Sequence, residues 1–331
     1  MTATLTVEGL KVAIGEANVL RGISLDVEPG EVRGLVGESG AGKSMLGRAV
    51  LGLLPANATI TSGHIAFEGR DLLQMREAER RGLLGRRIAL IPQDPMTSLN
   101  PVKRVGAQIG SLLRHHLGLS KHAAVVSATE LLTEVAIREP ERVLSLYPHE
   151  ISGGMRQRVL IAMALACKPS LVIADEPTTA LDVTIQAQIL DLLREMKSAF
   201  HLSLLLITHD LGVVAETADR VAVMYAGRIV EHGPVREIFR DPKHPYTRGL
   251  LASRPGAGRG HRLRAIDGSV PVLGAFPEGC AFHPRCPDRF EPCSSAPPPE
   301  YGVGDGRGAR CYLHDDHRAS GGRRPAERAG R

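Results

Sequence analysis

The sequence predicts an α/β protein whose sheet is largely parallel. Up to about residue 240, short β-branched runs alternate with amphipathic stretches of helical spacing, which is typical of this class. One apolar run leads directly into a glycine-rich loop, and two others end in acidic or polar residues. Farther on, the chain becomes rich in Gly, Pro and Cys, so we place a boundary near residue 250.

The individual elements support this class in chain order. Residues 62–72 alternate like an antiparallel edge strand, whereas residues 100–168 carry helical patterns with few strand signals. Residues 182–200 have apolar positions at helical spacing. After Asp241, prolines break the alternating pattern. Three apolar runs are predicted as buried strands: 31–37, 171–176 and 202–210.

Composition narrows the range of functions. The chain has 331 residues, of which 43% are hydrophobic, so a substantial core is expected. Aromatic residues make up only 3%, which argues against aromatic platforms for nucleic-acid bases. The longest apolar run, residues 159–167, is about half of the ~18–20 residues that a membrane span needs. The N-terminus lacks the pattern of a secretory signal, so we expect a cytosolic protein.

The positive charge is concentrated at the C-terminus. The formal net charge is +5, and residues 318–331 contribute five Arg and one Glu. The body of the chain is therefore close to neutral, which argues against a nucleic-acid partner. Residues 318–331 are predicted to be a disordered Arg/Gly-rich tail.

Residues 37–44, GESGAGKS, fit the phosphate-binding pattern G-x-x-x-x-G-K-[ST] between a predicted strand and a predicted helix. Glycines let backbone N–H groups surround phosphate oxygens, and the helix N-terminus adds a positive dipole end. Lys43 can bridge two phosphates and Ser44 can bind Mg²⁺. An incidental glycine-rich turn is the alternative. The expected nucleotide contacts are Gly37, Glu38, Ser39, Gly40, Ala41, Gly42, Lys43, Ser44 and Met45.

Two adjacent carboxylates lie at the end of the predicted strand over residues 171–176. Asp175 can lie near the metal, and Glu176 can accept a proton from the attacking water or orient it. A solvated strand end is the alternative. The presence of Lys43 elsewhere in the chain favours the catalytic interpretation.

Residues 151–158, ISGGMRQR, place two glycines where a helix is expected to begin. Ser152, Gly153 and Gly154 can form an anion site at that helix start. The alternative is that Ser152 is only an N-cap, but that role leaves both glycines unexplained.

These motifs together resemble those of the ATP-binding cassette (ABC) transporter ATPases over residues 5 to about 250. The matching motifs are the Walker A loop (37–44), the Q-loop glutamine (Gln93), the signature (151–158), the Walker B strand (171–176), the D-loop (178–182) and the switch histidine (His209). The resemblance implies a P-loop cassette with a RecA-like core, an antiparallel β subdomain and a helical subdomain.

The resemblance also implies a domain division. The expected units are an ATPase domain over residues 1–250, with a helical subdomain at about 95–168, and a Cys-rich extension over residues 251–317. Ile14 stands where the family usually has an aromatic residue that stacks on adenine. Preference for ATP over GTP is therefore less firmly implied than ATP hydrolysis itself.

In this family two cassettes pack head to tail around two ATP molecules. The resemblance implies that Ser152, Gly153 and Gly154 face the nucleotide of the partner subunit, with Asp182 of the D-loop nearby. The implied catalytic residues are Lys43, Gln93, Glu176 and His209, and the implied Mg²⁺ ligands are Ser44, Gln93 and Asp175.

Finer resemblance points to the ATPase subunits of dipeptide and oligopeptide importers. It rests on residues 93–109, 147–159 and 244–251, and Met155 replaces the Gln of the broad family. It implies a second ATPase subunit, two membrane permease subunits and a solute-binding protein, at the cytoplasmic face of the inner membrane. Nickel and opine importers share parts of these motifs, so those solutes stay open.

Four of the five cysteines cluster near the C-terminus with spacings C-x₅-C-x₆-C-x₁₇-C. They are Cys280, Cys286, Cys293 and Cys311. Disulfides are disfavoured in a reducing cytosol, and structural zinc usually has closer pairs, so we favour an iron–sulfur cluster over Zn²⁺ or free thiols. The resemblance to peptide-importer ATPases, some of which hold a [4Fe–4S] cluster in a similar Cys-rich C-terminal region, implies a cluster of that type. His283 and His314 are alternative ligands. Cys167 is predicted to be a small core residue.

The residues of this chain disfavour three other functions. A soluble ABC ATPase acting on ribosomes or DNA needs a second cassette or a long insertion, and only 59 positions separate Gln93 from Ser152. An exporter cassette lacks the subfamily motifs and the Cys-rich end. A subunit that binds ATP without hydrolysing it is disfavoured by Glu176 and His209.

Overall fold

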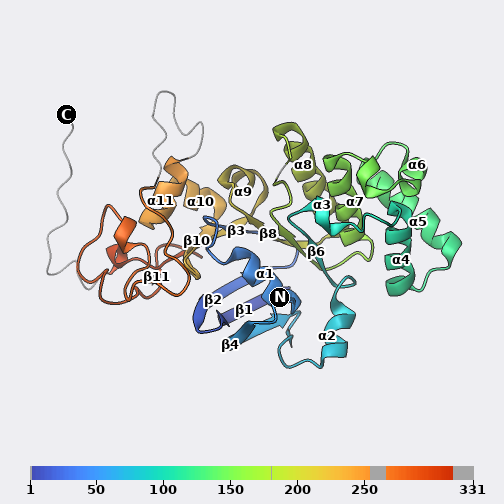
Figure 1. Cartoon of the computed structure of the whole chain (residues 1–331). Helices are drawn as coiled ribbons and strands as arrows, with labels where there is room; N and C mark the ends of the chain where they lie inside the picture. The colour runs from blue at the N-terminus through green and yellow to red at the C-terminus, as the bar shows by residue number, and fades with distance from the viewer. Residues whose placement is uncertain (1, 180, 254–265, 316–331) are drawn as a thin grey trace.

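The computed structural model describes residues 2–179, 181–253 and 266–315. Within these residues the main sheet has eight strands in the order β11-β12-β10-β9-β3-β8-β7-β6 (Figure 1). The strands are β3 (Val32–Val36), β6 (Ile88–Ile91), β7 (Leu171–Asp175), β8 (Ser203–Thr208), β9 (Arg220–Tyr225), β10 (Arg228–Pro234), β11 (Tyr301–Gly302) and β12 (Gly308–Ala309). The strands from β9 to β6 are parallel, which confirms the predicted class.

A second, antiparallel sheet packs beside the first. It has the order β2-β1-β4-β5, and its strands are β1 (Leu5–Ile14), β2 (Ala17–Val27), β4 (Ala58–Phe67) and β5 (Arg70–Asp71). This sheet contains the region over residues 62–72 that was predicted to be antiparallel. Its apolar face packs against α1 (Lys43–Leu51) and the central strands of the main sheet.

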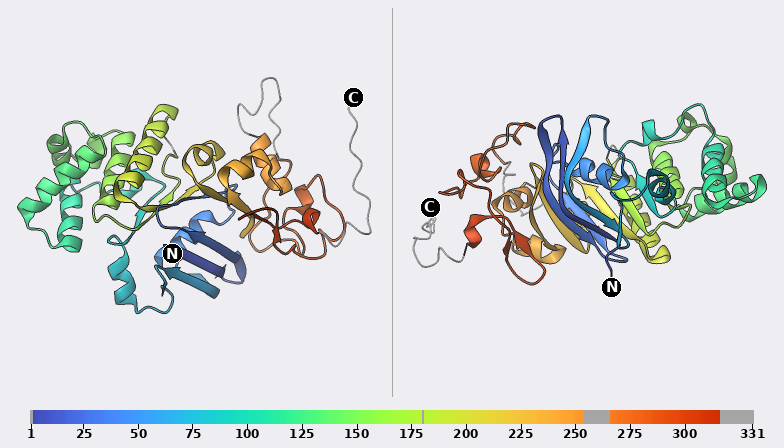
Figure 2. Two further views of the ribbon diagram at one scale, coloured as in Figure 1. Left: turned by 180° about the vertical axis from the view of Figure 1, so that it is seen from behind. Right: turned by 90° about the horizontal axis from the view of Figure 1, so that it is seen from below.

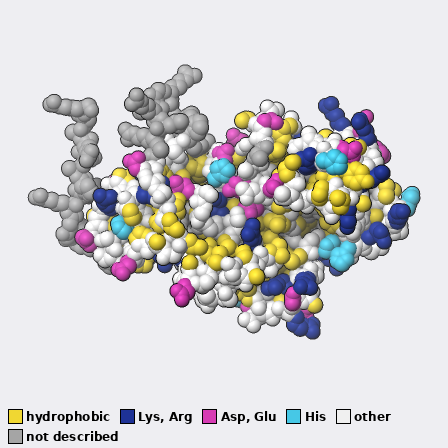
Figure 3. All heavy atoms as spheres, in the orientation of Figure 1, with side chains coloured by type: hydrophobic (Ala, Val, Ile, Leu, Met, Phe, Trp, Pro, Cys, Tyr) yellow, Lys and Arg dark blue, Asp and Glu magenta, His cyan; other side chains and the backbone are white. Residues whose placement is uncertain are grey.

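The helices between β6 and β7 gather at one end of the molecule, and α8 to α11 lie along the main sheet (Figures 1 and 2). The group between β6 and β7 consists of α3 (Pro95–Ser98), α4 (Val105–Leu117), α5 (Lys121–Glu134), α6 (Pro140–Ser145) and α7 (Gly153–Leu165). The other helices are α2 (Glu77–Leu83), α8 (Val183–Phe200), α9 (Leu211–Thr217), α10 (Val235–Arg240) and α11 (Pro245–Ala252). On the face drawn in Figure 3, Lys and Arg side chains lie mainly over α2 and the α4–α6 end.

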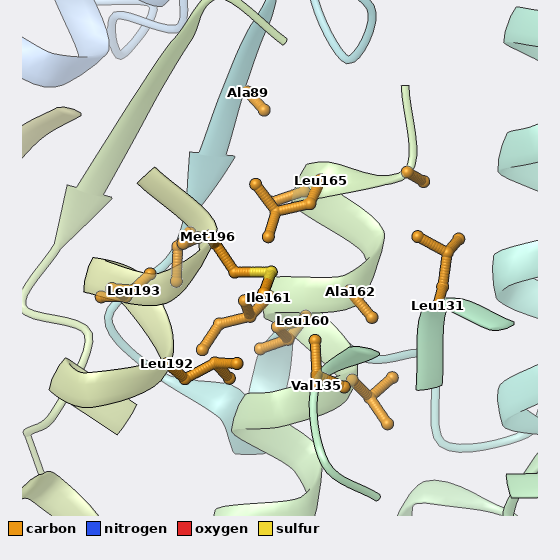
Figure 4. Packing of buried hydrophobic residues seen from close by; sticks show 14 of the residues in the cluster. Ala89, Leu131, Val135, Leu160, Ile161, Ala162, Leu165, Leu192, Leu193 and Met196 are labelled. Atoms are coloured by element: carbon orange, nitrogen blue, oxygen red, sulfur yellow. The ribbon is translucent and has the colours of Figure 1, made fainter. Parts of the chain in front are cut away.

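The sheet and the helical group share a hydrophobic core. Leu160, Ile161 and Leu165 of α7 pack against Leu193 and Met196 of α8 in this core (Figure 4). Ile161 is completely buried. Burial of these side chains fixes α7, and therefore the start of α7, relative to the sheet.

The C-terminal region differs from the sequence-based expectation in one respect. The prolines after Asp241 were interpreted as a break, yet Pro245 is the first residue of α11. Proline is compatible with this position because the first N–H of a helix has no intrahelical partner. Strands β11 and β12 then extend the main sheet, since β12 pairs with β10. The tail predicted over residues 318–331 lies outside the described residues.

None of the helices formed by the described residues is both long enough and apolar enough to cross a membrane.

Candidate active site

The carboxyl ends of four parallel strands bring the predicted site residues together. The loop over residues 37–42 follows β3, and Gln93 lies two residues beyond β6. Asp175 ends β7, Glu176 follows it, and His209 follows β8 directly. Because parallel strands end at the same edge of a sheet, residues that are far apart in the chain meet there.

Glycines are required at several positions of the loop between β3 and α1. Gly40 and Gly42 have φ angles of 80° and 103°, which L side chains rarely adopt. A Cβ atom on Gly37 would lie 2.2 Å from the carbonyl oxygen of Met224. Glycine at these positions therefore suits the shape of the loop, and the N-terminus of α1 that follows it is available to an anion.

Lys43 is buried at the base of this loop. Its Nζ donates to the carbonyl oxygens of Gly37 (2.8 Å) and Glu38 (3.2 Å) and lies 4.0 Å from Glu176 Oε1. Burial lowers the pKa of Lys43, while the nearby carboxylates, Glu176 first, oppose this change. The ammonium group is thus held by weak neutral acceptors that a phosphate can replace.

Ser44 and Asp175 meet at the end of β7. Ser44 Oγ donates to Asp175 Oδ1 over 2.9 Å. Burial raises the pKa of Asp175, and the charge of Glu176 adds to this effect, whereas the Ser44 hydrogen bond opposes it. A hydroxyl and a carboxylate in contact are the hard oxygen donors that Mg²⁺ prefers, so these two residues fit the metal assigned from the sequence.

Glu176 is the centre of a polar network. Its Oε2 accepts hydrogen bonds from Gln93 Nε2 (3.2 Å) and Thr179 Oγ1 (2.9 Å), and it lies 3.2 Å from His209 Nδ1. Its φ angle of 48° is unusual for a non-glycine residue, and its backbone N–H donates to Ile207. The strained backbone turns Glu176 away from the direction of Asp175, which gives the two carboxylates different surroundings.

Thr179 was not identified from the sequence as a site residue. Its hydroxyl donates to the carboxylate expected to act on water. The only signal was its place within the D-loop motif, which gives no indication of where its side chain points.

The signature residues lie at the start of α7. Ser152 is the N-cap, and its Oγ accepts from the N–H of Met155 over 3.3 Å. A Cβ on Gly154 would lie 2.9 Å from Ile185 Cγ2, so this glycine permits close packing of α7 against α8. Packing against Ile185, rather than capping by Ser152, thus gives a structural reason for Gly154. A Cβ on Gly153 would meet only one atom, at 3.9 Å.

Asp182 also forms a local bond in this structure. It caps α8, and its Oδ1 accepts from the N–H of Ile185 over 2.9 Å. Neither Ser152 nor Asp182 makes a described hydrogen bond to the loop over residues 37–44. Their predicted contacts with the nucleotide of a partner subunit stay a prediction.

The four C-terminal cysteines line a single cavity together with His244, Phe282 and His283. All four thiols are free. Burial raises the pKa of Cys286 to about 11 and that of Cys311 to about 12, and neighbouring thiols add to both shifts. His283 Nδ1 lies 2.9 Å from the Cys280 carbonyl oxygen, and His314 Nε2 lies 3.1 Å from that of Lys243.

No group of three or more His, Cys, Asp and Glu side chains within the described ranges is close enough to hold a metal ion. Cys167, at the end of α7, is only partly buried. The expectation that it is a core residue therefore holds only in part.

Comparisons with known proteins agree with this geometry. Residues 20–179 match the family described as ABC transporter, and residues 230–293 match the family described as oligopeptide/dipeptide transporter, C-terminal region. The chain is 48% identical to the dipeptide transport ATP-binding protein DppD of Bacillus subtilis, over 95% of this chain and 96% of that protein. It is also 48% identical to the oligopeptide transport ATP-binding protein OppD of Salmonella typhimurium, over 90% and 89% of the two chains.

A solved structure shares the fold. The cbiO1 protein of Clostridium perfringens, part of the ABC transporter complex cbiONQ, is similar with a TM-score of 0.62 and 28% identity. The similarity covers 73% of this chain and 92% of that chain.

Proposed function

This chain belongs to the ABC transporter ATP-binding family, and from that premise we propose that it powers peptide uptake through separate membrane subunits. The observation that carries the proposal is the meeting of Lys43, Ser44, Asp175 and Glu176 at one sheet edge in a chain whose C-terminal region matches the peptide-transporter family. The relatives named for dipeptide and oligopeptide transport support a peptide as the solute.

The proposed hydrolysis uses the network around Glu176. Glu176 Oε2 lies within hydrogen-bonding distance of Gln93 and His209. A water molecule next to this carboxylate would be oriented by Gln93 and His209 while Glu176 accepts its proton. Lys43 exchanges its carbonyl partners for phosphate oxygens and offsets their charge. Mg²⁺, held by Ser44, Asp175 and Gln93, would neutralise charge on the transferred phosphoryl group.

We assign the signature to the nucleotide of a second ATPase subunit. Ser152 and Gly153 lie at the start of α7, a 13-residue helix whose position is fixed by the core. The space beside Gly153 leaves its backbone N–H accessible to a phosphate. Closure of two subunits then traps ATP, and hydrolysis lets the two subunits separate. The pair of subunits thus has an open and a closed state, and bound ATP favours the closed state.

The proposed partners are a second ATPase subunit, two membrane permease subunits and a solute-binding protein, with this chain on the cytoplasmic face of the inner membrane. Residues 1–250 are proposed as the ATPase domain, with its helical part at 95–168, and residues 251–317 as the extension. The test is uptake of labelled dipeptide into vesicles that contain the complex, with Ni²⁺ and an opine as comparison solutes. Uptake of either comparison solute in place of peptide would refute the assignment.

We further propose that the cysteine-lined cavity holds a [4Fe–4S] cluster. In such a cluster each thiolate binds a different iron atom, so the thiols can stand farther apart than the ligands of a single ion. Four free thiols around one cavity support this proposal. Anaerobic purification with iron analysis and absorbance near 400 nm tests it. Colourless protein that contains zinc or no metal would refute it.

A further inference from the structure

A buried arginine of the C-terminal extension contacts the phosphate-binding loop directly. Arg285 ends the short 3-10 turn over residues 283–285, and its side chain is only 5% exposed. Its Nη1 and Nη2 donate to Glu38 Oε2 (2.7 Å) and Oε1 (3.0 Å). This is a two-pronged ion pair, the geometry in which Arg and a carboxylate bind most specifically. Glu38 is the second residue of the loop.

The remaining N–H groups of Arg285 are also used. Its Nε donates to the carbonyl oxygen of Asp267 (2.9 Å), Nη2 to that of Ile266 (3.3 Å), and Nη1 to Tyr225 Oη (3.3 Å). Five N–H donors therefore have five acceptors. The guanidinium group is fixed before it reaches Glu38, so little side-chain entropy remains to be lost in holding the loop.

The turn that carries Arg285 is itself anchored. Phe282, the residue directly before the turn, is buried against Tyr225 and Tyr246, with ring centroids 5.3 Å apart in both pairs. Tyr246 Oη accepts from the backbone N–H of Glu38 over 2.9 Å. The turn and α11 thus hold both the side chain and the backbone of Glu38. In Figure 1 the extension lies beside α11, next to the edge of the main sheet.

The position of Glu38 makes its neutralisation important. Its carbonyl oxygen accepts from Lys43, the residue expected to bind phosphate. A carboxylate in this loop without a cation beside it would repel the triphosphate and weaken ATP binding.

We propose that Arg285 is a positioning residue for ATP binding, which holds the phosphate-binding loop through Glu38 and neutralises that carboxylate. The extension thereby contributes a side chain that positions the nucleotide site. This inference rests on the assignment of residues 37–44 as the ATP site. Cys280 and Cys286 flank the turn that carries Arg285.

The experiment is a double-mutant cycle on the full-length chain, purified anaerobically, with the dissociation constant for Mg²⁺·ATP as the readout. Arg285→Gln is expected to weaken ATP binding about 10-fold, and adding Glu38→Gln is expected to recover most of that loss because the unpaired carboxylate is removed. Amide hydrogen exchange of residues 37–43 should become faster in Arg285→Gln and slower again in the double variant. Arg248→Gln is the control, since it breaks an ion pair to Asp288 of the same extension over 3.1 Å without touching the loop.

The outcomes separate the possible explanations. ATP affinity equal to that of the parent in Arg285→Gln, or no recovery in the double variant, overturns the inference. If Arg285→Gln does not fold, Arg285→Lys replaces it: Lys keeps the charge but lacks the planar fork, so amide exchange of residues 37–43 should still be faster than in the parent, and exchange at the parental rate overturns the inference. A parent chain that binds no ATP would instead refute the assignment of the nucleotide site.

Discussion

Glu176→Gln removes the proposed base while preserving its shape. The amide can turn its oxygen toward Gln93, Thr179 and His209, so the three contacts to Oε2 can be retained. What is lost is the negative charge 4.0 Å from Lys43 Nζ. At that distance two unit charges interact by about 4 kcal/mol at an effective dielectric constant of 20. In the ATP complex the triphosphate takes over as the partner of Lys43, so ATP affinity should stay equal or increase.

Turnover should fall much more. General base catalysis contributes about 10²–10⁴-fold, so we expect kcat to fall about 10³-fold, which corresponds to about 4 kcal/mol of activation free energy. The assay measures phosphate release by the assembled complex and ATP binding by the full-length chain. Glu195→Gln on the exposed face of α8 is the matched control. Turnover of Glu176→Gln at the parental rate would show that Glu176 is not the base.

Three further predictions concern the signature, the core and the sheet edge. Ser152→Ala and its control Ser120→Ala each remove a helix N-cap, so each should lower the free energy of unfolding by about 1 kcal/mol. Only Ser152→Ala should also slow ATP turnover, by more than about 10-fold. Turnover of Ser152→Ala at the parental rate would show that Ser152 is only a helix cap. Ile161→Ala should lower the free energy of unfolding in urea by about 3 kcal/mol, and a loss below about 1 kcal/mol would contradict its placement in the core. Hydrogen bonding to His232 first, and then the charges of His232 and Arg310, lower the pKa of Glu300, so the stabilisation that Glu300 contributes is present above its ordinary pKa and is lost as the pH falls through the lowered value. After solvent screening, Glu300→Gln should cost about 0.5 kcal/mol at pH 7 in thermal unfolding, and this cost should shrink as the pH falls below the ordinary pKa; a cost that does not change with pH would contradict the prediction.

Much of the site could be predicted because its residues lie in short local patterns. The loop over residues 37–44 needs its glycines for backbone reasons that hold in any fold. Asp175 ends one buried strand, and His209 follows another. Once the sheet is parallel, these residues must share an edge. The α/β class and the central strands followed from the same patterns.

The remaining features depend on contacts between segments that are distant in the chain. Arg285 and Glu38 are 247 positions apart, and neither residue type indicates its partner. Gly154 needs its small size because of Ile185, which belongs to a different helix. Pro245 was interpreted as a break because the same residue both ends one pattern and begins a helix. Only the assembled structure distinguishes these alternatives.

ATP-driven uptake of labelled dipeptide by the complex in sealed vesicles tests the central claim most directly when the subunit carries Lys43→Ala. Lys43 Nζ contacts two carbonyl oxygens of the loop and lies 4.0 Å from Glu176. Because no other residue in the stretch 37–44 is Lys or Arg, no other side chain of this loop can supply its charge to the phosphates. The account predicts that uptake falls to the level seen without ATP, while Lys197→Ala on α8 transports at the parental rate. Full uptake with Lys43→Ala would contradict it.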